Sequence, residues 1–243
     1  MSTFAAVMKY AVIAAGEGSR LAQEGIKSPK PLVEVAGERL IDRLLRVFMA
    51  NGASEVVAIC NEQMMDVQAR LQEIQNGGQV PLKFIVKSTP SSMHSMWELS
   101  RWLGDEPFVL TTVDTIFRES EFDAYIKTFH SLIARGEADG LMGVTDYIDD
   151  EKPLYVSTDE SLRITGFLDS CDVPKYISGG IYGLTPASID TLRRCIERGE
   201  SRMRNFQRAL VRDGLRLQAF PFSKVLDIDH ASDIAKAERF LKD

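Results

Sequence analysis

A glycine pair that follows an apolar run is the first feature of this sequence with evident chemistry. Residues 9–15 are apolar enough for a buried strand, and Gly16 and Gly18 follow directly. Glycines at this spacing let backbone N–H groups approach phosphate oxygens without obstruction by a Cβ atom. Such a pair also occurs in an ordinary tight turn after a strand, so the neighbouring residues must decide between the two interpretations.

Two cations near the glycines favour phosphate binding. Arg20 lies two residues after Gly18, and Lys30 is bracketed by Pro29 and Pro31. Proline fixes its own φ angle and restricts the residue before it, so the backbone around Lys30 is stiff. A rigidly held lysine suits a cation that must meet charge developing on a phosphoryl group. Together these residues predict a site that grips the phosphates of a nucleotide.

The loop matches neither of two common nucleotide-binding motifs. It lacks the GxxxxGK[ST] spacing of a Walker A loop, and Leu21 stands where a dinucleotide-binding fingerprint has its third glycine. A dehydrogenase is therefore disfavoured.

Asp114 is a candidate metal ligand. It directly follows an expected strand at 108–113, and open α/β sheets bind their ligands at the carboxyl ends of their strands. A carboxylate in that place can coordinate Mg²⁺ together with substrate phosphates. The alternative is an aspartate that caps the turn or helix that follows.

The first half of the chain alternates strands and helices, which positions these residues at one sheet edge. This order predicts a parallel sheet with helices on both faces and right-handed crossovers. The fold class we expect is α/β, a Rossmann-like three-layer α/β/α arrangement with a mostly parallel central sheet. Apolar patterning places strands at 9–15, 55–60, 82–86 and 108–113, a loop at 16–35, and helices at 40–51, 64–74 and 92–103.

The second half is less regular, and it is expected to bind the second substrate. We interpret residues 1–243 as one domain, with a nucleotide-binding half at about 1–115 and an acceptor-binding half at about 116–243. Patterning places helices at 121–134, 186–198, 203–213 and 232–241, and strands at 140–144, 154–157, 163–167, 176–184, 215–220 and 225–228.

Composition restricts the class of protein. The 243 residues are 44% hydrophobic and 26% charged, as in ordinary globular proteins, and the formal net charge of −6 argues against a nucleic-acid partner. No apolar run reaches the roughly 18 residues that span a membrane, and no signal peptide is evident. Cys60, Cys171 and Cys195 are far apart and odd in number, so structural zinc is not expected and a reducing, cytoplasmic location fits best.

Two blocks of sequence together resemble the signature of the sugar-phosphate nucleotidyltransferases, which make NDP-sugars and related compounds. Residues 14–21 read AAGEGSRL and residues 28–37 read SPKPLVEVAG. The family pattern is roughly (A/G)(A/G)GxG(S/T)R(L/M), a spacer, and then PKPL(L/V)x(V/I)xG. Both blocks occur in the family's order, and the resemblance extends from residue 9 to about 240. It implies the GT-A-like fold of nucleotide-diphospho-sugar transferases.

The resemblance implies roles for individual residues. Arg20 would face the phosphates, Lys30 would stabilise the transferring phosphoryl group, and Asp114 and Asp227 would hold Mg²⁺. Asp229 replaces a residue that is often glycine in the family, and it could be a second ligand or a helix cap. The residues expected to bind the nucleotide are Ala14, Ala15, Gly16, Glu17, Gly18, Ser19, Ser91 and Ser92.

The serines come from residues 89–96, TPSSMHSM. Many family members have a Gly-Thr-Ala run there, which helps to bind the base and ribose, and small hydroxyl residues would serve here instead. This arrangement is similar to that of cytidylyltransferases acting on non-sugar phosphates such as choline phosphate. The alternative is a serine-capped helix start with Met93, Met96 and Trp97 in the core.

The acceptor side departs from the family pattern. Residues 177–182, ISGGIY, resemble the (N/S)xG(I/L)Y strand that lies against the acceptor, although the glycines could instead mark a β-bulge. Many sugar 1-phosphate enzymes carry Glu-Lys-Pro just upstream of this strand, whereas the Glu-Lys-Pro at 151–153 lies about a strand pair too early. The residues expected to bind the acceptor are Asp169, Lys175, Gly179 and Gly180.

The predicted reaction is transfer of NMP from an NTP to a phosphorylated small-molecule acceptor, with Mg²⁺ as cofactor and pyrophosphate as by-product. A sugar 1-phosphate is the favoured acceptor, which would give an NDP-sugar. A cytidylyltransferase for choline phosphate or a polyol phosphate is the alternative within this class, and a non-catalytic nucleotide-binding sensor is the alternative outside it. A monomer or a homodimer is expected.

Overall fold

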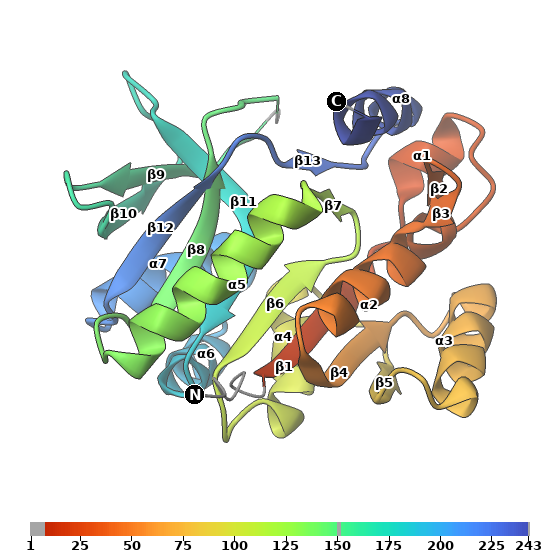
Figure 1. Cartoon of the computed structure of the whole chain (residues 1–243), viewed down its shortest axis with the longest axis horizontal. Coiled ribbons are helices and arrows are strands. Elements are labelled where there is room, and N and C mark those ends of the chain that lie inside the picture. Colours follow the sequence, from red (N-terminus) through yellow and green to blue (C-terminus); the bar gives the residue numbers. More distant parts are fainter. Residues whose placement is uncertain (1–7, 150–151, 243) are drawn as a thin grey trace, which may run out of the picture.

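The computed structural model describes residues 8–149 and 152–242, and a nine-stranded mixed sheet forms its centre (Figure 1). Seven strands follow one another in the order β10-β9-β11-β6-β1-β4-β5, while β8 pairs with β11 and β12. The strands are β1 (Met8–Ala14), β4 (Ala53–Cys60), β5 (Leu82–Val86), β6 (Phe108–Thr112), β8 (Gly140–Thr145), β9 (Tyr155–Thr158), β10 (Ile164–Leu168), β11 (Tyr176–Leu184) and β12 (Leu217–Phe222).

The nucleotide-binding half has the parallel arrangement that its sequence predicts. Strand β1 pairs in parallel with both β4 and β6, and β4 pairs in parallel with β5. The chain order of these four strands across the sheet is therefore 3-2-1-4, as in doubly wound folds. Strand β11 then runs antiparallel to β6, so the sheet changes direction where the second half begins.

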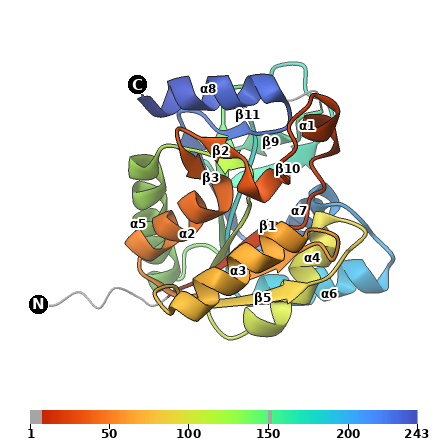
Figure 2. The same cartoon turned by 90° about the vertical axis from the view of Figure 1, so that its right-hand side faces the viewer.

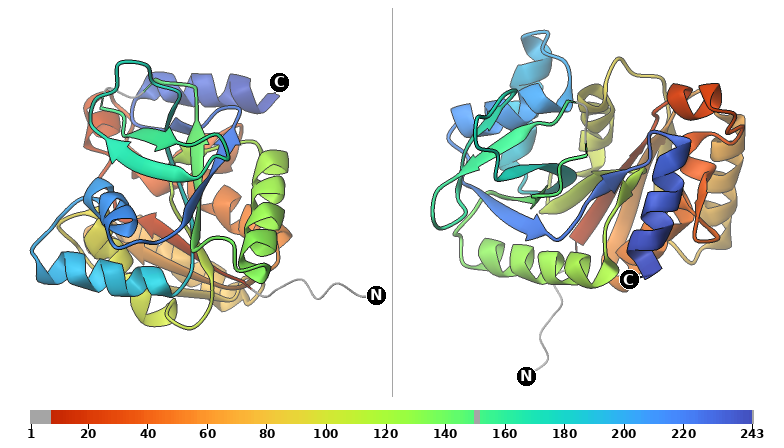
Figure 3. Two further views of the ribbon diagram at one scale, coloured as in Figure 1. Left: turned by 90° about the vertical axis from the view of Figure 1, so that its left-hand side faces the viewer. Right: turned by 90° about the horizontal axis from the view of Figure 1, so that it is seen from above.

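Helices cover both faces of the sheet, which confirms the three-layer prediction (Figures 2 and 3). Successive side chains of a strand point to opposite faces. Accordingly, Tyr10 and Val12 of β1 join one buried cluster, while Ala11 and Ile13 join the other. The first cluster includes side chains of α2 (Leu40–Ala50), α3 (Met65–Gly77), α5 (Glu119–Ala134) and α8 (Ala231–Lys242). The second includes side chains of α4 (Ser92–Leu99), α6 (Ala187–Glu197) and α7 (Met203–Arg212).

The segment predicted as a loop at 16–35 contains more structure than expected. It holds the one-turn helix α1 (Ser19–Gln23), a 3₁₀ turn at Lys30–Leu32 and the short strand β2 (Glu34–Val35), which pairs with β3 (Glu38–Arg39). These elements are too short to produce a hydrophobic period. The helix expected at 92–103 ends as an α-helix at Leu99 and continues as a 3₁₀ turn.

The bounds of β12 also differ from the sequence-based expectation. Strand β12 lies two residues later than the predicted 215–220, in parallel register with β8. Pro221 is tolerated in β12 because, among the described residues, β8 is the only named strand that pairs with it, and its other side carries one bridge, between Gln218 and Arg163. None of the helices in the described residues is both long and apolar enough to cross a membrane.

Candidate active site

A pair of two-residue strands brings the two candidate metal ligands to one place. Strand β7 (Thr115–Ile116) runs antiparallel to β13 (Leu226–Asp227), with Asp227 opposite Thr115. The N–H of Ile228 also donates to the carbonyl oxygen of Asp114 at 3.2 Å. Asp114 and Asp227 therefore meet at the carboxyl edge of the parallel strands, as expected, and their role as metal ligands stays a prediction.

Lys30 lies at the same junction. Its Nζ donates to Oδ2 of Asp114 at 2.6 Å and to Oδ1 of Asp229 at 2.7 Å, and its side chain is only 9% exposed. Burial by itself would lower the pKa of Lys30, but the two carboxylates outweigh it and raise the pKa above its ordinary value. Lys30 is therefore a permanent buried cation whose position is fixed from two sides.

The glycine loop and the lysine block contact each other. Gly18 has a left-handed backbone, with φ of 62°, and a Cβ atom built on it would lie 3.0 Å from Cβ of Lys30. Glycine is thus required at 18 both by its backbone conformation and by the close approach of Lys30. By contrast, nothing lies within 4 Å of a Cβ atom built on Gly16, where the space opens into a cavity.

Arg20 and Asp229 complete the charged cluster. Nη1 of Arg20 lies 3.2 Å from Oδ2 of Asp229. Burial opposes ionisation of Asp229, but the hydrogen bond from Lys30 outweighs it and lowers the pKa of Asp229. The oxygens of Asp229 accept from Lys30 and Arg20, while Asp233 accepts the N–H groups of residues 229 and 230 and Glu24 that of residue 231. Asp229 therefore does not cap α8, and its role as a second metal ligand stays a prediction.

One cavity, of about 360 Å³, lies on the side of this cluster where the nucleotide donor is expected, and we call it the donor-side cavity. Of the residues expected to bind nucleotide, Ala15, Gly16, Glu17, Ser91 and Ser92 line it, whereas Ala14, Gly18 and Ser19 do not. Ala14 is fully buried in β1. The other lining residues are Ile13, Lys30, Asn61, Thr89, Pro90, Ser95, Thr112, Val113 and Asp114.

The hydroxyl residues at 89–92 line this cavity, and Ser91 does not cap the helix that follows them. Ser91 is the N-cap residue of α4, but its side chain makes no capping hydrogen bond. Its Oγ lies 2.9 Å from Nδ1 of His94 instead. The serine-cap alternative is therefore wrong, although Met93 and Met96 are buried as that alternative expected and Trp97 packs against the same cluster.

A second cavity, of about 380 Å³, lies on the side where the acceptor is expected, and we call it the acceptor-side cavity. Arg20, Asp227 and Asp229 line it, together with Gly179 and Lys152. The charged cluster thus separates two cavities, one with Lys30 and Asp114 on its wall and one with Asp227 on its wall. The remaining lining residues are Thr145, Tyr147, Asp149, Ile177, Ser178, Val225, Leu226, His230, Ser232, Asp233 and Lys236.

The expected acceptor residues are only partly brought together. Gly179 lines the acceptor-side cavity, but Asp169, Lys175 and Gly180 do not. Asp169 pairs with arginines of α7, and Nζ of Lys175 lies over the ring of Tyr176. Lys152 does line this cavity. The expectation that its Glu-Lys-Pro run lies too early in the chain to contribute to the acceptor side was therefore wrong for Lys152.

The double glycine in β11 also has a structural role. The register between β11 and β8 is interrupted between Ser178 and Tyr182, as the β-bulge alternative expected. A Cβ atom on Gly179 would lie 3.1 Å from Cγ2 of Val225, and Gly180 has φ of 70°. Gly180 is therefore explained by its backbone conformation and Gly179 by the close approach of Val225, and Gly179 also lines the acceptor-side cavity.

Sequence reasoning missed several lining residues that share a position in the fold. Asn61 follows β4, Thr112 ends β6 and Thr145 ends β8. Each lies at the carboxyl end of a strand, where α/β sheets bind ligands. A polar residue that ends an apolar strand was therefore the available signal.

No cluster of three or more His, Cys, Asp or Glu side chains suited to a metal ion occurs within residues 8–149 and 152–242. Asp114 and Asp227 are a pair of carboxylates, which is the number that Mg²⁺ commonly takes from a protein when substrate phosphates supply further ligands.

Sequence comparison points to one family. A family model described as nucleotidyl transferase matches residues 9–243. Glucose-1-phosphate thymidylyltransferase of Streptomyces antibioticus is 26% identical over 219 residues, which are 87% of this chain and 60% of that protein. CMP-5'-(3-aminopropyl)phosphonate synthase of Streptomyces rubellomurinus is 25% identical over 163 residues, which are 60% of this chain and 25% of that protein. The chain thus spans between a quarter and three fifths of these curated relatives.

Solved structures agree on the fold. The inositol-1-phosphate CTP transferase from T. maritima superposes with a TM-score of 0.78 at 22% identity, covering 98% of this chain and 97% of that one. A UDP-glucose pyrophosphorylase complexed with UDP-glucose superposes with a TM-score of 0.77 at 17% identity, covering 96% and 98%. At these identities the likeness establishes a shared architecture over nearly the whole length of each chain.

Proposed function

The chain belongs to the nucleotidyl transferase family, and from that premise we propose that it transfers the NMP group of an NTP to a phosphorylated small-molecule acceptor. One observation carries the proposal. Lys30, Asp114 and Asp227 converge between two cavities of similar volume, about 360 and 380 Å³. A donor in the first cavity and an acceptor in the second would bring their phosphates together at this cluster.

The charges at the junction support a requirement for Mg²⁺. Two cations, Arg20 and Lys30, face the three carboxylates of Asp114, Asp227 and Asp229. This excess of negative charge would repel a triphosphate, so further positive charge is needed for binding. Asp114 and Asp227 fit that need, and bound Mg²⁺ would supply electrostatic stabilisation of phosphate oxygens.

The mechanism needs no general base. An oxygen of the acceptor phosphate, already anionic, attacks the α-phosphorus, and the bond from that phosphorus to the bridging oxygen of the β-phosphate breaks. The electron pair leaves with pyrophosphate. Lys30 stays protonated throughout, so it can offset charge on the α-phosphoryl group, and Arg20 can do the same for the leaving pyrophosphate. Catalysis then rests on positioning and electrostatics.

A sugar 1-phosphate is the acceptor that we place first, because curated relatives such as the thymidylyltransferase carry that substrate in their names. A cytidylyltransferase for a choline or polyol phosphate is the second candidate. It is favoured by the hydroxyl-rich wall of Thr89, Ser91 and Ser92, and by the CMP and CTP chemistry in the names of two related proteins.

The test is a panel of CTP, UTP, GTP, dTTP and ATP against sugar 1-phosphates, inositol phosphate and choline phosphate, with pyrophosphate release as the readout. We expect one pair to react only with Mg²⁺ present. Lys30→Ala, Asp114→Ala and Asp227→Ala should each lower turnover by about 10²-fold or more while the circular dichroism spectrum is retained. Wild-type turnover by the Lys30 variant would contradict the mechanism, and nucleotide binding without any pyrophosphate release would favour a sensor.

A further inference from the structure

A third cavity, of about 440 Å³, lies at the start of α7, and three of its six lining residues are arginines. Arg202, Arg204 and Arg208 face a single carboxylate there, that of Asp169, and Ser201 and Asn205 complete the wall. Three guanidinium groups against one carboxylate leave two positive charges in excess. This imbalance is notable in a chain whose net charge is −6.

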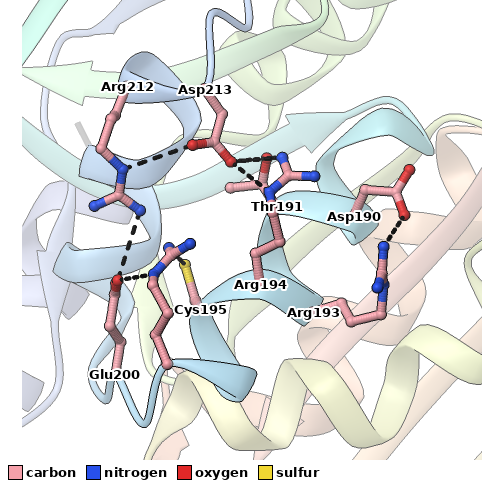
Figure 4. A network of polar contacts seen from close by, with 9 residues as sticks. Asp190, Thr191, Arg193, Arg194, Cys195, Glu200, Arg212 and Asp213 are labelled. Atoms are coloured by element: carbon pink, nitrogen blue, oxygen red, sulfur yellow. Dashed lines mark hydrogen bonds and ion pairs between the residues drawn. The ribbon is translucent and has the colours of Figure 1, made fainter.

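Neighbouring arginines show what a balanced arrangement looks like in the same part of the molecule. In the network between α6 and α7, Arg193 pairs with Asp190, Arg194 with Asp213, and Arg212 with Glu200 and Asp213 (Figure 4). With Arg198 and Glu197 included, the network has as many carboxylates as guanidinium groups. By contrast, the three arginines that line the third cavity face only one carboxylate there, that of Asp169.

The two inner arginines are oriented before any ligand arrives. Nη2 of Arg204 donates to the carbonyl oxygen of Lys152 at 2.9 Å, and Nε of Arg208 donates to that of Phe167 at 3.1 Å. Their remaining N–H groups converge on one atom, since each guanidinium lies 2.7 Å from Oδ1 of Asp169. Two guanidinium groups held around a single oxygen form the geometry that binds phosphate or carboxylate.

Asp169 is a replaceable occupant of this position. Its side chain is 63% exposed, whereas those of Arg204 and Arg208 are about 30% exposed. The hydrogen bond from Arg208, helped by that from Arg204, holds the pKa of Asp169 below its usual value. An exposed carboxylate that turns into solvent loses little, because water solvates it again.

The third arginine and the surrounding contacts link this cavity to both substrate cavities. Arg202 pairs with no carboxylate among the described residues, and its backbone has φ of 72°, which is uncommon for a residue other than glycine. Its N–H donates to Oγ of Ser91 on the donor side at 3.3 Å. Lys152, whose carbonyl oxygen holds Arg204, lines the acceptor-side cavity.

From this arrangement we propose that Arg202, Arg204 and Arg208 form an oxyanion-binding subsite, in which a phosphate or carboxylate group replaces the Asp169 side chain. The group can come from either of two sources. It can be a second anionic group at the far end of the acceptor, or it can belong to a separate anion that acts on both substrate cavities through Ser91 and Lys152.

Inorganic phosphate is the probe, titrated calorimetrically into the full chain at constant ionic strength. Arg204→Gln and Arg208→Gln should each weaken phosphate binding about tenfold, because each removes one charge-assisted contact. Asp169→Asn should tighten it severalfold, because the competing carboxylate is gone. Arg193→Gln removes the same charge outside the cavity and should leave binding within about twofold of wild type. Thermal melting of each variant checks that it is folded.

Phosphate affinity that is equal in wild type, Arg204→Gln and Arg208→Gln would overturn the proposal, as would weaker binding by Asp169→Asn. This binding arm does not depend on the proposed activity, so its failure and the failure of nucleotidyl transfer are separate results.

The second arm rests on the proposed function and separates the two sources. If the acceptor carries the anion, Arg208→Gln should raise KM about tenfold for acceptors with a second anionic group and leave KM for neutral ones unchanged. If a separate anion binds, phosphate should change turnover without competing with the acceptor, and the variant should abolish that effect. If phosphate binds through the arginines, but Arg208→Gln leaves KM for every acceptor unchanged and phosphate leaves turnover unchanged, the link to the substrate cavities is overturned.

Discussion

The contact between Gly18 and Lys30 allows the positioning of Lys30, the proposed catalytic lysine, to be tested without removing it. In Gly18→Ala the new Cβ atom would lie 3.0 Å from Cβ of Lys30, against an optimal carbon–carbon separation of about 3.5–4.0 Å. One of the two blocks must therefore move by about 0.5 Å. Lys30 holds Asp114 and Asp229 through contacts of 2.6 and 2.7 Å, so this movement acts directly on the cluster.

The expected loss of activity follows from that displacement. A misplacement of about 1 Å can cost about 10²-fold in rate, so half of that predicts about a tenfold fall in kcat. The left-handed backbone at Gly18, with φ of 62°, adds a stability cost of about 1–2 kcal/mol for alanine. In a chain of 243 residues this corresponds to a fall in Tm of about 2–8 °C.

Gly25 provides the matched control. It lies in the same segment with φ of 91°, but nothing is within 4 Å of a Cβ atom built on it. Gly25→Ala should therefore lose a similar amount of stability while its pyrophosphate release stays within about twofold of wild type. The two variants are compared by thermal melting and by steady-state kinetics. If Gly18→Ala and Gly25→Ala have equal kcat at equal loss of Tm, the inference that Gly18 positions Lys30 is refuted.

Three further changes test other parts of the structure. Arg43→Met removes the buried guanidinium that donates to the carbonyl oxygen of Phe117 at 2.6 Å, and urea unfolding should show a loss of about 2 kcal/mol; an unchanged midpoint would contradict this. Gly179→Ala should lower stability by about 1–3 kcal/mol through overpacking against Val225 and against Gly143 of β8, seen as a lower Tm, and an unchanged Tm would contradict the close approach. The hydrogen bond with Glu24 raises the pKa of His230, so their pair stabilises fully below the ordinary value of 6.5 and less as pH rises through the higher folded pKa. His230→Gln should therefore lower Tm more at about pH 6 than at about pH 9, and an equal loss at both would exclude this linkage.

The part of the fold that follows from local sequence is the parallel half. Its strands are continuous apolar runs with helices between them, and both signals arise within about 15 residues. The prediction that Asp114 and Asp227 meet was correct, yet it depended on family resemblance, because the β7–β13 pair that joins them has two residues per strand. Strands that short carry no periodicity, and their pairing is fixed by tertiary contacts alone.

The acceptor side shows the limit of sequence spacing as a guide. Lys152 was set aside because it occurs early in the chain, but β9 and β10 pair with each other and β9 also pairs with β11. The chain therefore leaves the acceptor-side cavity along this hairpin and returns to it at β11, so Lys152 and Gly179 line the same cavity. Distance along the chain was a poor measure of distance in space wherever antiparallel strands reverse its course. Asp169, which directly follows β10, is carried by the same hairpin away from Gly179 and toward α7. A residue that was expected to bind the acceptor therefore lies among arginines instead.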